Sequence, residues 1–290
     1  MEAIQTIPLG DWEVTGFIES HFALDGGSMF GVIPQKLWKK LIPPDENNLV
    51  AMQTNLYVIK TGDANILCDT GLGDALSDFD RKVYSPRSPS RINEALHAIG
   101  TPPEAITHVI FTHLHTDHSN GAVTGDPDHP DLRFPNAEYI VQTDEWEDAT
   151  HPNERTSAVY LQHRLKPLAD SGRLRLVEGD EEILPGVAVR KTGGHTRGHQ
   201  GVRVTRGGLL FLYYGDILPS RFHLKGPYVA AVDLLPLDTM AVKRVLLKEC
   251  CDTPTIIGFD HDIAVMFGRI VRKEKWLDVE PVETRSVSLV

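Results

Sequence analysis

Apolar residues in this chain are grouped in short, β-branched runs, which predict many strands with a few helices between them. Residues 12–24 alternate partly between polar and apolar side chains, as a half-buried strand does. Residues 49–60 and 64–69 are two further runs, and the Thr-Gly-Asp between them is typical of a hairpin turn. More strands are predicted at residues 106–111, 137–142, 173–177, 187–191, 201–205, 209–214 and 253–258. The parts of the chain before and after residue 180 are both rich in strands, which is consistent with two similar half-sandwiches.

A helical spacing of apolar residues occurs in fewer places. Between residues 90 and 99, Ile92, Ala95, Leu96 and Ile99 recur at the three- and four-residue steps of one helix face. Helices are also predicted at residues 144–149, 157–168 and 239–250. Residues 125–135 are rich in Asp, Pro and Gly and predict a loop, whereas residues 267–277 fit either a closing strand or an irregular helix. Because helices and buried strands alternate, the pattern indicates an α/β protein.

Residues 28–44 form an apolar segment with two interpretations. Met29, Phe30 and Trp38 look exposed in this segment. The segment is either a loop and short helix packed on the core, or an apolar surface that forms the rim of a functional site or a subunit contact in a homodimer. The pattern favours neither interpretation.

Composition indicates a globular protein that does not bind nucleic acid. The chain has 290 residues, 41% of them hydrophobic, and we expect residues 1–290 to form a single domain. The net charge of −11 argues against nucleic-acid binding, which requires clustered positive charge. We expect a small-molecule substrate as the partner and no nucleic acid.

Cysteine usage and hydropathy predict a cytoplasmic protein. Cys68, Cys250 and Cys251 do not make a disulfide framework, which fits a reducing compartment. No secretory signal is recognisable at the start of the chain, and no apolar run reaches the length of about 18 residues that a membrane span needs. We therefore expect no membrane contact.

The strongest chemical signal is in residues 112–121, which read T-H-L-H-T-D-H-S-N-G. They place four metal-binding side chains directly after a predicted buried strand: His113, His115, Asp117 and His118. From an extended backbone, His113 and His115 can point the same way toward one cation, and a second cation close by can take the other two. Imidazole and carboxylate suit zinc, with iron, manganese and cobalt as alternatives.

The H-x-H-x-D-H motif after an apolar strand resembles the metallo-β-lactamase-fold hydrolases. Four further motifs match in order and type: Asp69 in C-D-T-G, His195 in G-G-H-T-R-G-H, Asp216 in Y-Y-G-D and His261 in F-D-H-D. This resemblance implies a four-layer αββα sandwich. The pattern G-G-S-M-F-G-V-I-P-x-x-L-W near the start is similar to that of the quorum-quenching acyl-homoserine lactonases and their relatives of the methyl parathion hydrolase type.

The resemblance also implies a role for each matched residue. One metal would take His113, His115 and His195, the other would take Asp117, His118 and His261, and Asp216 would bridge the two. Asp69 would hold a ligand imidazole in orientation from outside the ligand shell. His199 would be a buried, hydrogen-bonded residue of the same outer layer. Asp260 and Asp262 flank His261, and the sequence does not decide what they do.

The expected reaction is hydrolysis by a hydroxide that bridges two metal ions and is held by Asp216, with Asp117 as a proton shuttle. No G-x-S-x-G motif is present, which argues against a serine hydrolase. Lactonases of the family often carry a Tyr three residues after the bridging Asp, and this chain departs from them with Pro219. Met29, Phe30, Phe222, His223 and Tyr228 are the candidates for the substrate pocket.

The sequence leaves alternatives open. A lactone and a phosphotriester are both neutral electrophiles that need hydroxide and a Lewis acid, so an organophosphate hydrolase would carry the same site. A mononuclear iron sulfur dioxygenase of the same fold would leave the second set of ligands unused. A nuclease is disfavoured by the negative charge, and a non-catalytic relative would have no reason to keep a full ligand set.

Overall fold

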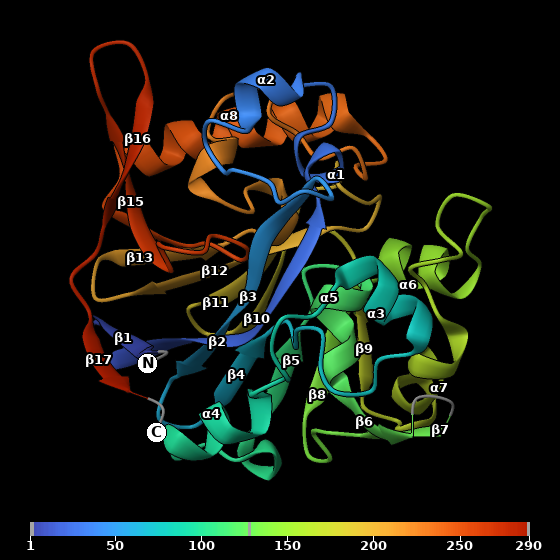
Figure 1. Cartoon of the computed structure of the whole chain (residues 1–290). Coiled ribbons are helices and arrows are strands. Elements are labelled where there is room, and N and C mark those ends of the chain that lie inside the picture. Colours follow the sequence, from blue (N-terminus) through green and yellow to red (C-terminus); the bar gives the residue numbers. More distant parts are fainter. Residues whose placement is uncertain (1–2, 127–128, 289–290) are drawn as a thin grey trace.

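The computed structural model describes residues 3–126 and 129–288, in which two sheets pack face to face (Figure 1). The first sheet has the strand order β17-β1-β2-β3-β4-β5-β8-β9. Its pairs are antiparallel from β17 to β4 and parallel from β4 to β9. The strands of this sheet are β1 (Ala3–Leu9), β2 (Trp12–Asp25), β3 (Leu49–Lys60), β4 (Asn65–Cys68), β5 (His108–Ile110), β8 (Glu138–Gln142), β9 (Leu174–Val177) and β17 (Arg285–Ser288).

All strands of the second sheet come from the chain after residue 180, in line with the division that the strand pattern indicated. Its order is β10-β11-β12-β13-β14-β15-β16, and the β13–β14 pair alone is parallel within it. The strands are β10 (Glu181–Leu184), β11 (Val187–Lys191), β12 (Gln200–Arg206), β13 (Leu209–Tyr213), β14 (Thr255–Gly258), β15 (Phe267–Arg272) and β16 (Leu277–Pro281). The exception to the division at residue 180 is β17, which returns to the first sheet and pairs with β1.

Helices cover the outer faces of both sheets (Figure 1). They are α1 (Gly26–Phe30), α2 (Gln35–Trp38), α3 (Asp78–Tyr84), α4 (Ile92–Ala98), α5 (Thr116–Ser119), α6 (Thr143–Thr150), α7 (Gln162–Asp170) and α8 (Pro236–Asp252). Short 3₁₀ turns occupy Pro103–Ala105, Asn120–Ala122, Gly215–Ile217 and Arg221–His223. None of the described helices is both long and apolar enough to cross a bilayer.

The four layers follow from alternation along the strands. In β3, Tyr57 and Ile59 point into the core between the two sheets, whereas Leu56 and Val58 belong to a separate core under α4 and α7. In the second sheet, β13 divides in the same way between the central core and a third core beneath α8. The expected αββα sandwich is therefore confirmed. Both faces of the central strands β4, β13 and β14 are buried, which explains why these strands read as nearly continuous apolar runs.

Several elements differ from those predicted. Residues 125–135, predicted as a loop, include part of a two-stranded hairpin of β6 (Val123–Asp126) and β7 (His129–Leu132), although residues 127–128 lie outside the described part. This small edge sheet is mostly exposed, so it lacks an apolar pattern and tolerates proline. The closing segment is a strand over Phe267–Arg272, not a helix.

The helix predicted at residues 157–168 starts later, at Gln162. The carboxamide oxygen of Asn153 accepts hydrogen bonds from the backbone N–H groups of Arg155 and Thr156, at 2.8 and 3.2 Å. Such a side-chain turn redirects the chain before a helix can begin. The short elements β1, β10 and α3 were not predicted at all.

The apolar segment at residues 28–44 packs on the core. Met29, Phe30 and Trp38 look exposed in the sequence but are only 6%, 1% and 2% exposed, so the first of the two interpretations, a segment packed on the core, is confirmed. The Phe30 ring stacks on Trp38 with centroids 5.3 Å apart, and both belong to an apolar cluster that closes one end of the sandwich. The exposed apolar side chains here are Val32 and Leu37, and a homodimer contact through this segment would rest on those two.

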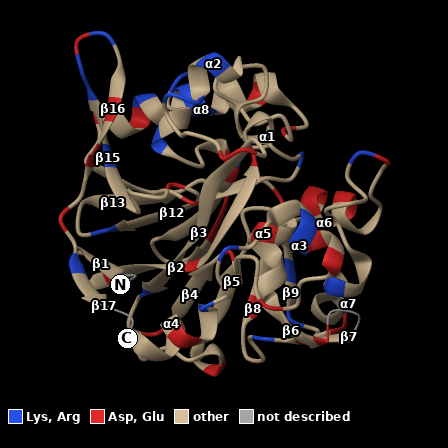
Figure 2. Ribbon diagram, in the orientation of Figure 1, with Lys and Arg blue, Asp and Glu red and all other residues tan. Residues whose placement is uncertain are grey.

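The fold brings the predicted ligand loops to one edge of the two sheets. Loops that follow the carboxyl ends of β4 and β5 carry Asp69 and the histidine motif, and those after β11, β13 and β14 carry His195, Asp216 and His261. The carboxyl ends of parallel strands are where α/β sheets place their sites. Acidic residues gather on α6, beside the His195 loop (Figure 2). Arg197 of that loop pairs with Asp144, Glu147 and Asp148 of α6 at 2.9, 3.0 and 2.8 Å.

A buried ion pair holds α3 against α7. The Arg164 guanidinium donates to the Asp80 carboxylate, and both side chains are almost fully buried. Asp80 also accepts from the N–H and hydroxyl of Ser77, which completes a capping box at the start of α3. Burial opposes the charged form of Asp80, but the Arg164 and Ser77 hydrogen bonds outweigh it and lower its pKa.

We predict that Asp80→Ala lowers the free energy of unfolding by about 3–5 kcal/mol, because it leaves the Arg164 charge buried without a partner. Urea denaturation measures this loss. Since the pKa of Asp80 is lowered, its contribution is present above the unfolded value near 3.8 and is lost as the pH falls below it. Asp170→Ala on α7 is the control, because Asp170 pairs with Lys166 at the surface and should cost less than about 1 kcal/mol. Equal losses in the two variants would contradict the prediction.

Candidate metal centre

Two groups of metal-binding side chains meet at this edge, and they share one carboxylate. His113, His115, His195 and Asp216 offer ligand atoms that all lie within 4.8 Å of one another. The second group consists of His118, Asp216, Asp260 and His261, with ligand atoms within the same 4.8 Å limit. The four predicted motifs that follow different strands are therefore brought together.

The Asp216 carboxylate turns one oxygen toward each group. Its Oδ2 lies 3.1 Å from His195 Nε2 in the first group. Its Oδ1 lies 3.6 Å from His118 Nε2 and 3.4 Å from His261 Nε2 in the second group. A carboxylate in this position can contribute one oxygen to each of two cations, which an imidazole cannot do.

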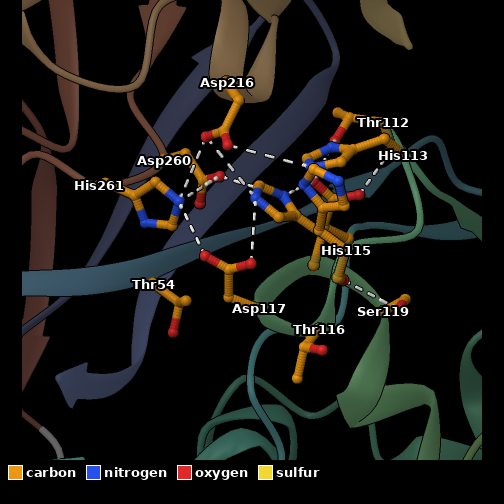
Figure 3. Close-up of polar contacts among 12 residues, drawn as sticks. Thr54, Thr112, His113, His115, Thr116, Asp117, Ser119, Asp216, Asp260 and His261 are labelled. Carbon is orange, nitrogen blue, oxygen red and sulfur yellow. Dashed lines mark hydrogen bonds and ion pairs between the residues drawn. The ribbon is translucent and has the colours of Figure 1, made fainter. Parts of the chain in front are cut away.

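Asp117 approaches the second group from the side opposite Asp216, and the two carboxylates flank the His261 ring (Figure 3). Asp117 Oδ2 lies 3.6 Å from His261 Nε2, and its Oδ1 lies 3.9 Å from His118 Nε2. Asp117 and His118 both lie on the single turn of α5, which starts directly after His115. Because of this turn, Asp117 and His118 point toward the second group of ligands, whereas His113 and His115 point toward the first.

Asp260 is a member of the second group that the sequence left undecided. Its Oδ2 is 3.3 Å from His261 Nε2 and 3.2 Å from His118 Nδ1, and the residue is 2% exposed. Asp262 points elsewhere, because its carboxylate accepts from Arg221 and from the N–H groups of Ala264 and Val265. In the sequence, both aspartates are direct neighbours of His261, so adjacency could not show which of them belongs to the metal centre.

The imidazole nitrogens that face away from the centre have hydrogen-bonding partners. Asp69 Oδ2 lies 3.0 Å from His118 Nδ1 and also accepts from the Tyr213 hydroxyl at 2.8 Å. Asp233, which sequence reasoning missed, accepts from His195 Nδ1 at 2.8 Å. The Gln53 carbonyl lies 2.9 Å from His261 Nδ1. Such partners fix the orientation of each ring and direct its other nitrogen inward.

His199 lies beside the first group, but its ligand atoms do not belong to it. Its Nδ1 lies 2.6 Å from the Thr192 hydroxyl, and its ring centroid lies 5.2 Å from that of His113. Its Nε2 is one of the buried nitrogens without a hydrogen-bond partner within the described residues. Gly198 precedes it because a Cβ there would lie only 2.1 Å from the Glu145 backbone nitrogen.

Glu145, which the sequence gave no reason to select, connects the two main ligand loops. It is fully buried on α6 and accepts from the Leu114 N–H at 2.9 Å, within the histidine motif. It also accepts from the Thr196 hydroxyl at 2.5 Å, next to His195, and from the Tyr160 hydroxyl at 2.7 Å. One buried carboxylate thus fixes both loops relative to each other.

The donor set fits divalent cations. Four buried side-chain atoms that face the centre have no hydrogen-bond partner within the described residues: His113 Nε2, His118 Nε2, Asp216 Oδ1 and Asp260 Oδ2. Such atoms are costly to bury unless something binds them. Imidazole nitrogens and carboxylate oxygens are the donors that zinc and similar ions prefer. Metal ions would satisfy all four atoms at once.

The pKa shifts show how unbalanced the centre is on its own. Burial, reinforced by His118 and His115 nearby, lowers the pKa of His113 well below its usual value. Burial raises the pKa of Asp260 to about 7. Burial also opposes the charged form of Asp216, but His195 and His118 outweigh it and hold its pKa well below the usual range. Positive charge beside the carboxylates is therefore what the centre requires.

A cavity of about 390 Å³ opens onto the centre and has largely apolar walls. His115, Asp117, Asp216 and His261 are among its lining residues. The walls include Leu24, Met29, Val159, Ala230, Leu234 and Pro219. The volume falls in the range of about 300–1,000 Å³ typical of small-molecule sites.

The other residues predicted for the substrate pocket pack near Met29, next to this cavity. Phe30, Phe222 and His223 line a second, much smaller cavity, to which Met29 and His261 also contribute. The His223 ring stacks on Phe30 with centroids 5.1 Å apart, and its Nε2 lies 2.9 Å from the Met29 carbonyl. Tyr228 packs edge-on against Phe30.

Comparison with known proteins agrees with this architecture. The sequence model of the Metallo-beta-lactamase superfamily matches residues 49–249, which is more than half of the chain. The chain belongs to this superfamily. The matched region includes the histidine motif, His195 and Asp216, and the chain is a metal-dependent hydrolase.

Among characterised relatives, an N-acyl homoserine lactonase of a Bacillus species is 29% identical over 221 residues, covering 71% of this chain and 80% of the relative. A probable metal-dependent hydrolase from Staphylococcus aureus superposes with a TM-score of 0.88 at 28% identity, covering 96% of this chain and all of that one. AidC, described as a dizinc quorum-quenching lactonase, has a TM-score of 0.80 at 20% identity over 97% and 98% of the two chains. The last likeness concerns the fold alone.

We predict that Asp260→Asn weakens metal binding in the second group by about 10- to 100-fold, because it removes a buried negative charge from beside two imidazoles. Chelator competition followed by elemental analysis measures this affinity. Asp262→Asn is the matched control: its carboxylate binds Arg221 and the backbone, so metal affinity should not change. Unaltered metal affinity in Asp260→Asn would show that this carboxylate has no part in holding the metal.

Proposed function

We propose that the protein is a binuclear metal-dependent lactonase that opens N-acyl-homoserine lactones or closely related esters. The observation that carries this proposal is the Asp216 carboxylate, whose two oxygens face two separate histidine groups 3.1 and 3.4 Å away. A mononuclear dioxygenase would have no use for the second group. In this proposal the ligands are His113, His115 and His195 on one side, His118, His261 and Asp117 on the other, and Asp216 between them.

The ions would be zinc, with iron, manganese and cobalt as alternatives. Bound divalent ions would supply a Lewis acid that polarises the substrate carbonyl and lowers the pKa of a bound water, to about 7 in the case of zinc. The residues supply position and proton transfer. Asp216 would hold the attacking water in line with the cavity, and Asp117 would take up its proton and deliver it to the leaving oxygen.

The apolar walls of the cavity support a substrate with an apolar chain. Leu24, Met29, Val159 and Leu234 line it, and the one cationic residue in its described lining, Arg155, donates to the Ala231 carbonyl at 3.0 Å. An acyl chain could lie against these walls while the lactone ring reaches Asp117 and Asp216. Several relatives are named N-acyl homoserine lactonases, which supports the same substrate class. Opening such a lactone would make the protein a quorum-quenching enzyme.

A phosphotriester is the second candidate substrate, because it also presents a neutral electrophile to the same centre.

Three free cysteines support the expectation of a reducing, cytoplasmic location. No nucleic-acid partner is proposed, given the net charge of −11.

The proposal predicts two divalent ions per chain in protein purified without added metal, together with hydrolysis of N-hexanoyl-homoserine lactone. Elemental analysis and a pH-stat assay, run beside paraoxon as a phosphotriester, test both parts. Two metals with paraoxon turnover alone would transfer the proposal to organophosphates. One iron per chain with no hydrolysis of either compound would refute it.

We further predict that Asp216→Ala loses at least one metal ion and nearly all hydrolysis. The substitution removes the one carboxylate that faces both groups, and the neighbouring imidazoles cannot take its place. Metal content and lactone turnover are measured on the same preparation. A variant that kept both ions and the wild-type rate would exclude the bridging role. Asp148→Ala, at a partly exposed position of α6 where the side chain pairs with Arg197, is the control that should retain both properties.

A further inference from the structure

The cavity above the centre has few uncharged hydrogen-bond donors near the position where an ester would react. Pro219 follows the Asp216 turn and contributes neither a side-chain donor nor an N–H. Among the other described lining residues, Ser28, Tyr84 and Thr156 carry hydroxyl groups. Within the described residues, Tyr84 is the one of these three whose hydroxyl contacts a carboxylate of the centre.

The Tyr84 hydroxyl lies 3.4 Å from Asp117 Oδ1, and the residue is 7% exposed. A distance of 3.4 Å is long for an O–H···O hydrogen bond, which is typically about 2.7–2.8 Å. The phenol is therefore close to Asp117 but not tightly engaged with it. A phenol hydroxyl carries one O–H that can donate a hydrogen bond, so this group is a donor.

The chain holds Tyr84 in this position from three sides. Tyr84 is the last residue of α3, whose start is fixed by the buried Asp80–Arg164 pair. The next residue, Ser85, has φ +41, so the backbone turns sharply after the tyrosine. The Tyr84 ring packs edge-on against Phe22 with centroids 6.0 Å apart, and Phe22 in turn contacts the His261 ring at 5.6 Å.

We propose that the Tyr84 hydroxyl donates a hydrogen bond to the leaving oxygen of the substrate, beside the proton-carrying oxygen of Asp117. The inference rests on the proposed lactonase function and assigns a further catalytic residue to it. As the ring carbon–oxygen bond breaks, its electron pair passes to the ring oxygen, while the new carbon–oxygen bond to the attacking water is retained. The proton that Asp117 took from that water then goes to the ring oxygen. Tyr84 keeps its own proton and stabilises the negative charge until that transfer.

The test compares two substrates that differ in the leaving atom. N-hexanoyl-homoserine lactone releases a strongly basic alkoxide, whereas N-hexanoyl-homocysteine thiolactone releases a thiolate, which is less basic and a weaker hydrogen-bond acceptor. We expect Tyr84→Phe to lower kcat for the lactone on the order of 10²-fold, as does removal of one donor to a developing oxyanion. For the thiolactone, the change should be less than about threefold. KM and metal content should stay near the wild-type values.

Tyr139→Phe is the matched control, because it removes a buried hydroxyl that donates to the Phe134 carbonyl, away from the cavity. It should change neither rate. Equal losses of Tyr84→Phe on both substrates, an unchanged rate on both, or a loss of metal would each overturn the assignment. Failure of the proposed function would look different, since the wild-type protein itself would then hydrolyse neither compound.

Discussion

The arrangement of this molecule depends on burying several imidazoles and carboxylates at one point. Charged or strongly polar groups are costly to remove from water unless each finds a partner. Here the outward nitrogens of His118 and His195 are satisfied by Asp69 and Asp233, and the inward atoms are left facing one another across the Asp216 carboxylate. The protein therefore supplies hydrogen-bond partners for the outward nitrogens of these groups but not for their inward atoms. Metal ions would bind the inward atoms, which couples metal binding to the stability of this end of the sandwich.

Two packed sheets suit this requirement because they deliver rigid loops from several directions. The strands end at a common edge, so loops that are distant in sequence approach from both sheets. Their relative positions are then fixed by buried carboxylates rather than by the strands alone. Glu145 binds the histidine motif and the His195 loop at once, and Asp69 accepts from Thr112 and from Tyr213 of the other sheet. A shift of either sheet would break these bonds and move the ligands apart.

How much the sequence predicted depends on how local each signal is. Asp216 and the histidines of the centre were found because each follows an apolar strand in a short, recognisable motif. The αββα layering was expected from the resemblance to a known fold, and alternation along strands such as β3 agrees with it. Glu145 and Asp233 were missed because their partners are far away in sequence, at Thr196 and His195. The burial of Phe30 and Trp38 stayed one of two open interpretations for the same reason, since an apolar run does not reveal what packs on it.

The division of labour between ligand loops and cavity walls explains why the reaction is easier to infer than the substrate. The ligands come from strand ends that the core holds in place, so the chemistry of the centre follows from the fold. The walls come from other elements: Met29 from α1, Tyr84 from α3, and residues 230–232 and 234 from the loop before α8. Pro219 has both roles. Its side chain is part of the cavity wall, whereas its backbone carbonyl supports a ligand loop by accepting from the His261 N–H at 2.8 Å. A residue at position 219 can therefore change its side chain without disturbing the centre, and the donor that acts on the substrate can come from a different element.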